Sequence, residues 1–394
     1  MNSASRNSSP AVDVNSTVSI LSTIYLGVIG AAVFIVQPGF VQGMVESLGF
    51  GEQQAGFIAS AEVWGIAATS VLLAFWAPRF NWVKFLNVSL LLFVGGNLAS
   101  LTTGDLTSFG LLRFIVGLGS GGLISLTFTV MGLTRFPERN LGYLIIGVLI
   151  YSACSLWVMP TALAAIGLNG IIVFFALFGA SGWFCLRHMP ESGEAHYPAV
   201  ADSVDISTGL RVTAVLAMFI YFLAIGGTWA YLFLIGLNAG INEQEVANGL
   251  FLSQLSGIAG ALIVTVAAHR LGRTSLLTVG VPGGGMILLV LFGQFSALTY
   301  VVAVCIYCFA WNMSHPLLLA SMASFERKGR VVHYAVAAQM SGLAIGPAGA
   351  AALLLEDDYS QVLRAGIVLF FVAYLLLLAP LLNHRRLMRE RSLA

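Results

Sequence analysis

Long apolar stretches alternate with short polar ones along almost the whole chain. The apolar stretches run for about 20 residues or more, the length at which a helix crosses a hydrocarbon core of about 30 Å. Strands of a membrane β-barrel give alternating segments of only about ten residues, so we expect helices. We predict twelve spans, at 17–46, 53–76, 83–102, 107–133, 141–164, 168–187, 210–238, 244–268, 274–293, 298–322, 332–355 and 361–383.

The composition supports a membrane protein and excludes several other classes. Of 394 residues, 58% are hydrophobic and 9% are charged, whereas a soluble domain has about 25% charged residues. A disordered chain needs low hydrophobicity and high net charge, which this chain lacks. The formal net charge of +1 offers no basic surface for nucleic acid. We therefore expect an all-α membrane protein in contact with the lipid bilayer.

Basic residues gather in the loops on one side of the predicted membrane. Arg79, Arg135 and Arg273 lie on this side with the C-terminal arginines, while Glu52 and Glu243 lie in opposite loops. Short loops rich in Lys and Arg remain in the cytoplasm. We therefore expect a multi-pass protein of the inner (cytoplasmic) membrane with both termini inside. Residues 1–16 are expected to form a flexible cytoplasmic tail without a cleaved signal peptide, and residues 384–394 a basic one.

Two polar segments of the first half recur in the second half at one interval. The segment 49–53 (GFGEQ) aligns with 240–244 (GINEQ), and 79–81 (RFN) aligns with 270–272 (RLG). A duplication of six spans explains both matches. It predicts two pseudo-symmetric six-helix bundles, at 17–190 and 209–383, joined by a cytoplasmic linker at 191–208. Parallel repeats of this kind enclose a cavity near the membrane midplane.

Two motifs resemble those of the major facilitator superfamily, and the similarity extends over about 17–383. The segment 269–273 (HRLGR) resembles the D-R-x-G-R loop of that family, with His in place of Asp. The segment 113–121 (RFIVGLGSG) resembles its R-x-x-x-G-x-G-x-G stretch. The resemblance implies a twelve-helix transporter, in which Arg270, Gly272 and Arg273 act in gating. Arg79 lies in a degraded first-half copy of the loop.

Few ionisable residues fall inside the spans, where they are costly and usually functional. Glu62 is about 14 Å deep in the second span and Arg113 about 9 Å deep in the fourth, at 1.5 Å per residue. We interpret Glu62 as the proton-carrying group, because a buried carboxyl exchanges its proton according to how near a cation lies. The fork of Arg113 suits either Glu62 or a substrate carboxylate. The alternative is a fixed pair that only holds two helices together.

Other polar and aromatic residues inside the spans are candidates for proton coupling or for the cavity. His315 could relay protons, or could satisfy carbonyls freed beside Pro316. The predicted cavity residues are Gln37, Trp229, Trp311, Asn312 and Gln339. The resemblance implies that spans one, four, seven and ten line the cavity. The amides could instead form hydrogen bonds between helices, and the tryptophans could be packing residues.

These observations predict a secondary transporter working by alternating access. A small organic anion, aromatic or amphipathic, would be co-transported with a proton, and no cofactor or metal would take part. The fifth span lacks the antiporter signature of the resembled family, which favours symport. Proton-driven efflux of hydrophobic drugs or metabolites is the alternative. A single mid-membrane carboxylate does not suffice for an intramembrane enzyme, and the resemblance implies a monomer.

Overall fold

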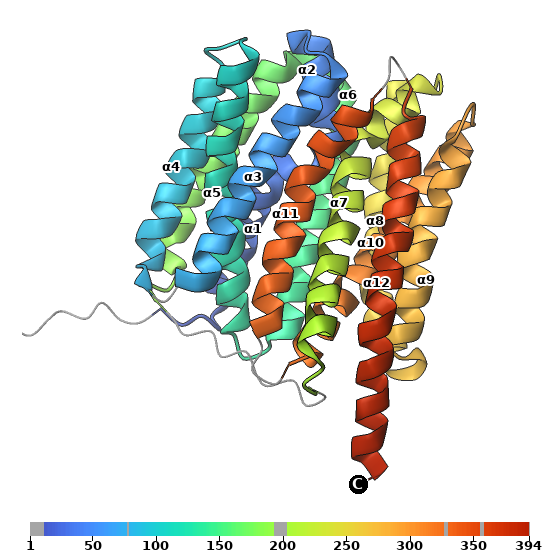
Figure 1. Cartoon of the computed structure of the whole chain (residues 1–394). Coiled ribbons are helices and arrows are strands. Elements are labelled where there is room, and N and C mark those ends of the chain that lie inside the picture. Colours follow the sequence, from blue (N-terminus) through green and yellow to red (C-terminus); the bar gives the residue numbers. More distant parts are fainter. Residues whose placement is uncertain (1–11, 77–78, 193–202, 327–329, 355–357, 394) are drawn as a thin grey trace, which may run out of the picture.

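The computed structural model describes residues 12–76, 79–192, 203–326, 330–354 and 358–393, which are almost entirely helical (Figure 1). The α-helices are α1 (Thr17–Ile35), α2 (Gln37–Leu48), α3 (Glu52–Trp76), α4 (Trp82–Ser100), α5 (Leu106–Gly132), α6 (Pro137–Ser181), α7 (Thr208–Asn238), α8 (Glu243–Leu271), α9 (Arg273–Met286), α10 (Ala297–Ser324), α11 (Arg330–Leu353) and α12 (Ser360–Leu393). Two 3-10 helices, η2 (Gly182–His188) and η3 (Ile287–Leu291), extend α6 and α9.

Eleven helical stretches of the described chain are long and apolar enough to cross a membrane. One of them, Arg139–His188, has 50 residues and at 1.5 Å per residue would be roughly 75 Å long, too long for one crossing. It is broken at Gly167, whose backbone is left-handed with φ 62°. The rings of Tyr151 and Phe178, on either side of the break, stack at 5.5 Å. The chain therefore turns back at Gly167, and the predicted twelve spans are present.

The first span, predicted as one helix over 17–46, is divided. α1 ends at Ile35 and α2 starts at Gln37, with Pro38 in its first turn. Proline lacks an N–H group and cannot continue the hydrogen-bond ladder of a helix. The hydroxyl of Ser152 on α6 donates to the carbonyl of Ile35 at 3.2 Å. This bond satisfies one backbone group freed by the break, as burial in a membrane protein requires.

Helix starts repeat between the two halves at a constant interval. α1, α3, α4 and α5 begin at Thr17, Glu52, Trp82 and Leu106, and α7, α8, α9 and α10 begin at Thr208, Glu243, Arg273 and Ala297. The matched Gly49 and Gly240 both have positive φ, 66° and 81°, a conformation that glycine adopts without strain. The duplication inferred from the sequence is therefore visible in the backbone.

The helices of each half pack mainly on one another. In the first half α1, α3 and α4 contact α5, and in the second half α7 contacts α11 and α12 while α10 contacts α8 and α9. Among the described residues, the halves meet most extensively where α3 packs on α11, α6 on α8, and α2 on α7. Figure 1 shows the helices side by side in one bundle, with the C-terminal part of α12 projecting beyond it. Residues 384–393, which we expected to form a basic cytoplasmic tail, continue α12 as a helix.

The two ends of the bundle differ in charge. We call the end that holds Arg79, Arg135 and the terminus of α12 the basic end. The opposite end, with Glu52, Asp105 and Glu243, is called the acidic end.

Glycines allow α3 and α5 to approach closely. A Cβ atom added at Gly117 would clash with the backbone carbonyl of Glu62, and one at Gly121 would clash with that of Ile66. Small residues at such crossings are what allow membrane helices to pack backbone to backbone. Since the obstacle is backbone rather than a flexible side chain, the two helices would have to separate to admit a larger residue.

We predict that Gly117→Ala lowers the stability of the protein by about 1–3 kcal/mol, because overpacking forces backbone shifts. Thermal unfolding of the purified protein in detergent measures the loss. Gly132→Ala, on the same helix, is the matched control, since an added Cβ there meets no atom within 4 Å. Equal melting temperatures for the two variants would contradict the close α3–α5 packing.

Candidate functional site

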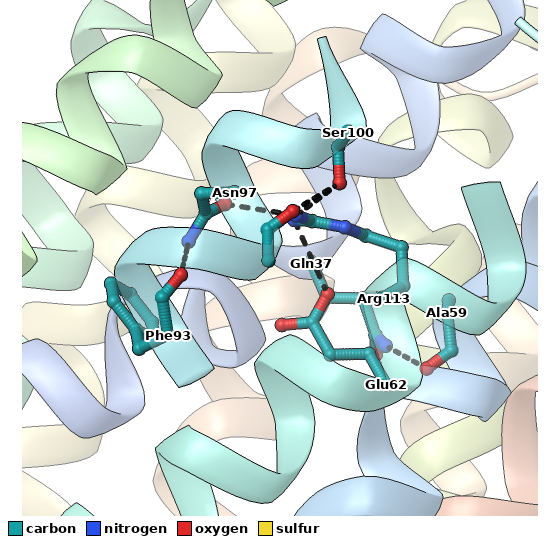
Figure 2. Close-up of polar contacts among 8 residues, drawn as sticks. Gln37, Ala59, Glu62, Phe93, Asn97, Ser100 and Arg113 are labelled. Carbon is teal, nitrogen blue, oxygen red and sulfur yellow. Dashed lines mark hydrogen bonds and ion pairs between the residues drawn. The ribbon is translucent and has the colours of Figure 1, made fainter. Parts of the chain in front are cut away.

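Glu62 and Arg113, both singled out from the sequence, face each other between α3 and α5. Arg113 Nη1 lies 3.9 Å from Glu62 Oε2, and the side chains are 0% and 5% exposed. Figure 2 shows the two side chains pointing toward one another. The distance is longer than a hydrogen bond, so the contact is a Coulombic attraction between two buried groups.

The other nitrogen of the guanidinium is held by α4. Arg113 Nη2 donates to Asn97 Oδ1 and to Ser100 Oγ, each at 2.9 Å. Asn97 and Ser100 are themselves buried. Neither was among the residues predicted to form the site. Their signal in the sequence is two polar residues three positions apart, which places them on one face of a helix.

Two phenyl rings flank the guanidinium. The Cζ atom of Arg113 is 5.6 Å from the ring centroid of Phe40 and 5.6 Å from that of Phe109. Both distances are within the range of a cation–π interaction. Phe40 belongs to the first turns of α2, so the break in the first span brings its ring against Arg113. These rings were also absent from the predicted site.

Gln37 completes this cluster, although its amide is only weakly bonded. Its Nε2 donates to the carbonyl of Ala59 on α3 at 3.4 Å (Figure 2). Four buried polar atoms of the cluster have no hydrogen-bond partner in the described protein: Gln37 Oε1, Glu62 Oε1, Arg113 Nε and Arg113 Nη1. Buried polar atoms are normally paired. The cluster thus retains donors and acceptors for a further partner, such as a proton or an anion.

A second cluster lies in the other half of the chain. His315 Nε2 on α10 and Gln339 Oε1 on α11 are 3.2 Å apart, and the His315 ring packs edge-on against Phe222 at 5.0 Å. The rings of Trp229 and Trp311 meet at 5.7 Å in a T-shaped arrangement. Trp229 is buried, and its indole N–H has no partner in the described protein. The structure therefore brings four predicted residues into two pairs.

Asn312, also predicted for the cavity, bonds within its own helix. Its Nδ2 donates to the carbonyl of Cys308, one turn earlier on α10, at 3.0 Å. A Cβ atom added at Gly257 on α8 would lie 2.7 Å from the same nitrogen. Asn312 thus lies at the α8–α10 contact, and its side-chain hydrogen bond is within α10 rather than the bond between helices that was the alternative to a cavity role.

The predicted gating residues lie at the basic end, at the starts of α4 and α9. Gly272 precedes α9 with φ 79°, and Arg273 Nη1 donates to the carbonyl of Ala320 on α10 at 3.5 Å. Arg79 is exposed. The side chain of Arg270 lies outside the described residues.

Hydrogen bonds join the halves toward the acidic end. Tyr231 OH on α7 donates to the carbonyl of Glu52 at 3.0 Å, and Gln53 Nε2 donates to the carbonyl of Leu354 at 3.1 Å. Closer to the middle of α3, the hydroxyl of Ser60 donates to the carbonyl of Ala344 on α11. The two halves are therefore in contact at the acidic end.

We predict that Glu62 and Arg113 are energetically coupled. Arg113→Gln removes the cation facing a buried carboxyl, and Glu62→Gln leaves a buried cation with neutral acceptors, so each costs stability. The double variant removes both charges and should recover about 0.5–3 kcal/mol of the summed loss. Thermal melting of the four proteins at one pH measures this coupling energy. Strictly additive losses would show that the pair does not interact.

Comparisons with known proteins agree with this architecture. A family model described as Major Facilitator Superfamily matches residues 23–347. A candidate niacin/nicotinamide transporter of Bacillus subtilis (strain 168) is 27% identical over 135 residues, or 32% of this chain. That match spans about a third of the relative, 34% of its length.

Solved structures of transporters share the fold at low sequence identity. The xylose transporter XylE from E. coli, in a partially occluded inward open conformation, has a TM-score of 0.70 at 15% identity, covering 90% of this chain and 98% of that one. A peptide transporter POT in complex with sulfate has a TM-score of 0.74 at 13% identity, covering 96% and 97%. The family match spans most of the chain: the protein is a membrane transporter rather than an enzyme, and it belongs to the Major Facilitator Superfamily.

Proposed function

We propose that this transporter is a symporter that carries a small organic anion together with a proton. The observation that supports the proposal best is the buried Glu62–Arg113 pair, because both side chains keep atoms without a hydrogen-bond partner. Ionisable residues inside a membrane protein commonly mark proton or substrate paths. A carboxyl that is not hydrogen-bonded to its cation can gain a proton without breaking a direct bond.

In the proposed cycle, Glu62 carries the proton and Arg113 supplies the fixed positive charge. When Glu62 is protonated, Arg113 is free to attract an anionic substrate group. When Glu62 is ionised, it neutralises Arg113 and competes with the anion. Proton and anion would therefore bind together, and neither would cross efficiently alone. Alternating access then exposes the loaded site to either side of the membrane.

The aromatic pair Trp229–Trp311 supports a substrate with a flat apolar part. Aromatic rings pack on such groups in edge-on or offset geometry. His315 and Gln339 would add polar contacts in the same half. The relative named for niacin and nicotinamide is consistent with a small ring-bearing substrate.

The basic residues at one end of the bundle bear on how the protein is oriented in the membrane. Following the positive-inside rule, we propose that the basic end, with Arg79, Arg135 and the end of α12, faces the cytoplasm and that the membrane is an inner membrane. We propose that a single chain transports, with neither a cofactor nor a metal. Arg79, Arg270, Gly272 and Arg273 would act in gating at this end.

Proton-driven efflux is the second candidate function. An ionised Glu62 could attract a hydrophobic cation, which the apolar surroundings of the pair would accommodate. Arg113, 3.9 Å away, disfavours a cation there by repulsion, so symport of an anion is preferred. Reconstitution with the pH gradient in each direction separates the two: an inward proton gradient accumulates an anion in the first case and expels a cation in the second.

We predict that Glu62→Gln lowers proton-driven accumulation in proteoliposomes by about tenfold or more, because the amide cannot carry a proton. The residual transport should lose its dependence on pH, whereas wild-type uptake falls as alkaline pH removes protons from the entry side. Uptake of radiolabelled nicotinate and a panel of other aromatic carboxylates gives the measurement.

Ser70→Ala is the control for this variant, since it alters a buried polar residue of α3 that bonds to Ser125 within the same half, without removing an ionisable group. It should retain the wild-type pH profile. Unchanged proton-driven uptake in Glu62→Gln would exclude Glu62 as the proton carrier.

A further inference from the structure

We propose that Asn97 is a positioning residue: together with Ser100 it anchors Arg113 on α4 and so keeps the guanidinium from closing onto Glu62. This inference rests on the proposed proton-carrying role of Glu62 and assigns the residues that make that role possible. Asn97 and Ser100 both bond to Arg113, and no hydrogen bond of the described protein joins either of them to Glu62. Both would act through Arg113 alone.

The two anchors are themselves oriented by their own helix. Asn97 Nδ2 donates to the carbonyl of Phe93 at 2.8 Å, which turns Oδ1 toward Arg113 (Figure 2). The hydroxyl of Ser100 donates to the carbonyl of Gly96 at 2.7 Å. Its single proton is thereby used, and its oxygen is left to accept from Arg113. The accepting oxygens of Asn97 and Ser100 are thus oriented by bonds within α4, independently of Arg113.

Competition between the anchors and Glu62 sets the distance between the charges. Arg113 Nη2 makes two hydrogen bonds of 2.9 Å to α4, while Nη1 remains 3.9 Å from Glu62. Guanidinium and carboxylate groups in direct contact form short bidentate bonds, which strongly favour the ionised carboxylate. Holding Nη1 beyond hydrogen-bond distance weakens that preference. When Glu62 takes up a proton, it then loses its Coulombic attraction to Arg113 but no hydrogen bond to it.

Phe40 and Phe109 restrict the alternative orientations of the guanidinium. Their rings lie at equal distances of 5.6 Å from Cζ and leave the α4 anchors and Glu62 as its polar contacts. Arg113, whose Nη1 is 3.9 Å from Glu62 Oε2, is the charged group that faces Glu62 in the described part of the chain. Of the helices packed on α3, α5 supplies this arginine. Glu46 is at the far end of α2, and Arg330 and His333 belong to the opposite, basic end of α11.

Two substitutions at Asn97 should therefore act in opposite directions. Asn97→Leu removes an acceptor at similar volume. It loosens the hold on Nη2, lets Nη1 approach Glu62, and lowers the pH at which Glu62 is half protonated. Asn97→Asp places a carboxylate against Arg113, competes for its charge, and raises that pH. We expect each variant to change the proton affinity of Glu62 by about tenfold, one pH unit. Ser100→Ala should resemble Asn97→Leu with a smaller effect.

The experiment is an infrared difference titration of the full chain in lipid nanodiscs. The carboxyl C=O band of Glu62 is assigned by its loss in Glu62→Gln. The band of the carboxyl that Asn97→Asp introduces is recorded in the double variant Glu62→Gln/Asn97→Asp and subtracted. Asn140→Leu is the matched control, because Asn140 is a buried asparagine of the same half whose amide donates to Thr134 Oγ1 at 2.9 Å. It should leave the titration unchanged.

Opposite shifts for Asn97→Leu and Asn97→Asp support the positioning role. Shifts of the same sign, or shifts no larger than that of Asn140→Leu, overturn it. If Asn97→Leu does not fold, Ser100→Ala and Asn97→Asp provide the same pair of opposite signs. The transport assay on Glu62→Gln tests the proposed function separately. If the Glu62 band titrates at the same pH in the Asn97 variants as in the wild type, only the positioning role of Asn97 is excluded. If uptake by Glu62→Gln still depends on pH, the proton-carrying role of Glu62 is excluded.

Discussion

The burial of a permanently charged guanidinium inside the membrane span is the constraint around which the first half is organised. A charge at this depth costs several kcal/mol unless it is paired and hydrogen-bonded. Arg113 meets this cost with contacts from four helices: Phe40 on α2, Glu62 on α3, Asn97 with Ser100 on α4, and Phe109 on its own α5. Gly117, one turn after Arg113, sets the α3–α5 distance by admitting the backbone of Glu62 itself. The close packing of α3 on α5 therefore also sets the distance between the two charges.

The duplication preserved the backbone while the chemistry of the two halves diverged. At the interval that relates the helix starts, Glu62 corresponds to Ser253 and Arg113 to Val304. The second half has no counterpart of the ion pair at those positions. It instead holds the aromatic pair Trp229–Trp311 and the His315–Gln339 contact. Among these residues, the first half thus holds the buried ion pair and the second half holds the aromatic pair.

Much of the fold follows from the sequence because membrane spans are set by length and hydropathy, which are local properties. The predicted starts of the second, fourth and eighth spans lie within one residue of α3, α5 and α8. The pairing of Glu62 with Arg113 was also anticipated, since two rare buried charges of opposite sign have few other partners. The break at Val36 was not predicted, although Pro38 was visible. A proline alone does not distinguish a kink from a new helix, because neighbouring groups such as Ser152 decide whether the freed carbonyls are satisfied.

The anchors of Arg113 were missed for a different reason. Asn97 and Ser100 share a helix face in any reading of the sequence, but whether that face meets α5 depends on how each helix is rotated about its axis. That rotation is set by packing, here by small residues such as Gly96 and Gly119 where α4 and α5 touch. The same limit applies to Asn312, whose polar side chain turned out to bond within α10. Hydropathy predicts how deep a residue lies in the membrane, but its hydrogen-bond partner depends on how the helices pack.

The break in the first span connects the buried pair to the contact between the halves. α2 begins beside Arg113, where Phe40 lies on the guanidinium, and the same short helix packs against α7 of the other half. α3 carries Glu62 and also bonds across to α11 through Ser60. The pair therefore lies against two elements that join the halves, and both continue to the acidic end, where Tyr231 and Gln53 bond across. The interruption at Val36 thus separates the part of the first span that packs within its own half from the part that contacts both the charged pair and the opposite half.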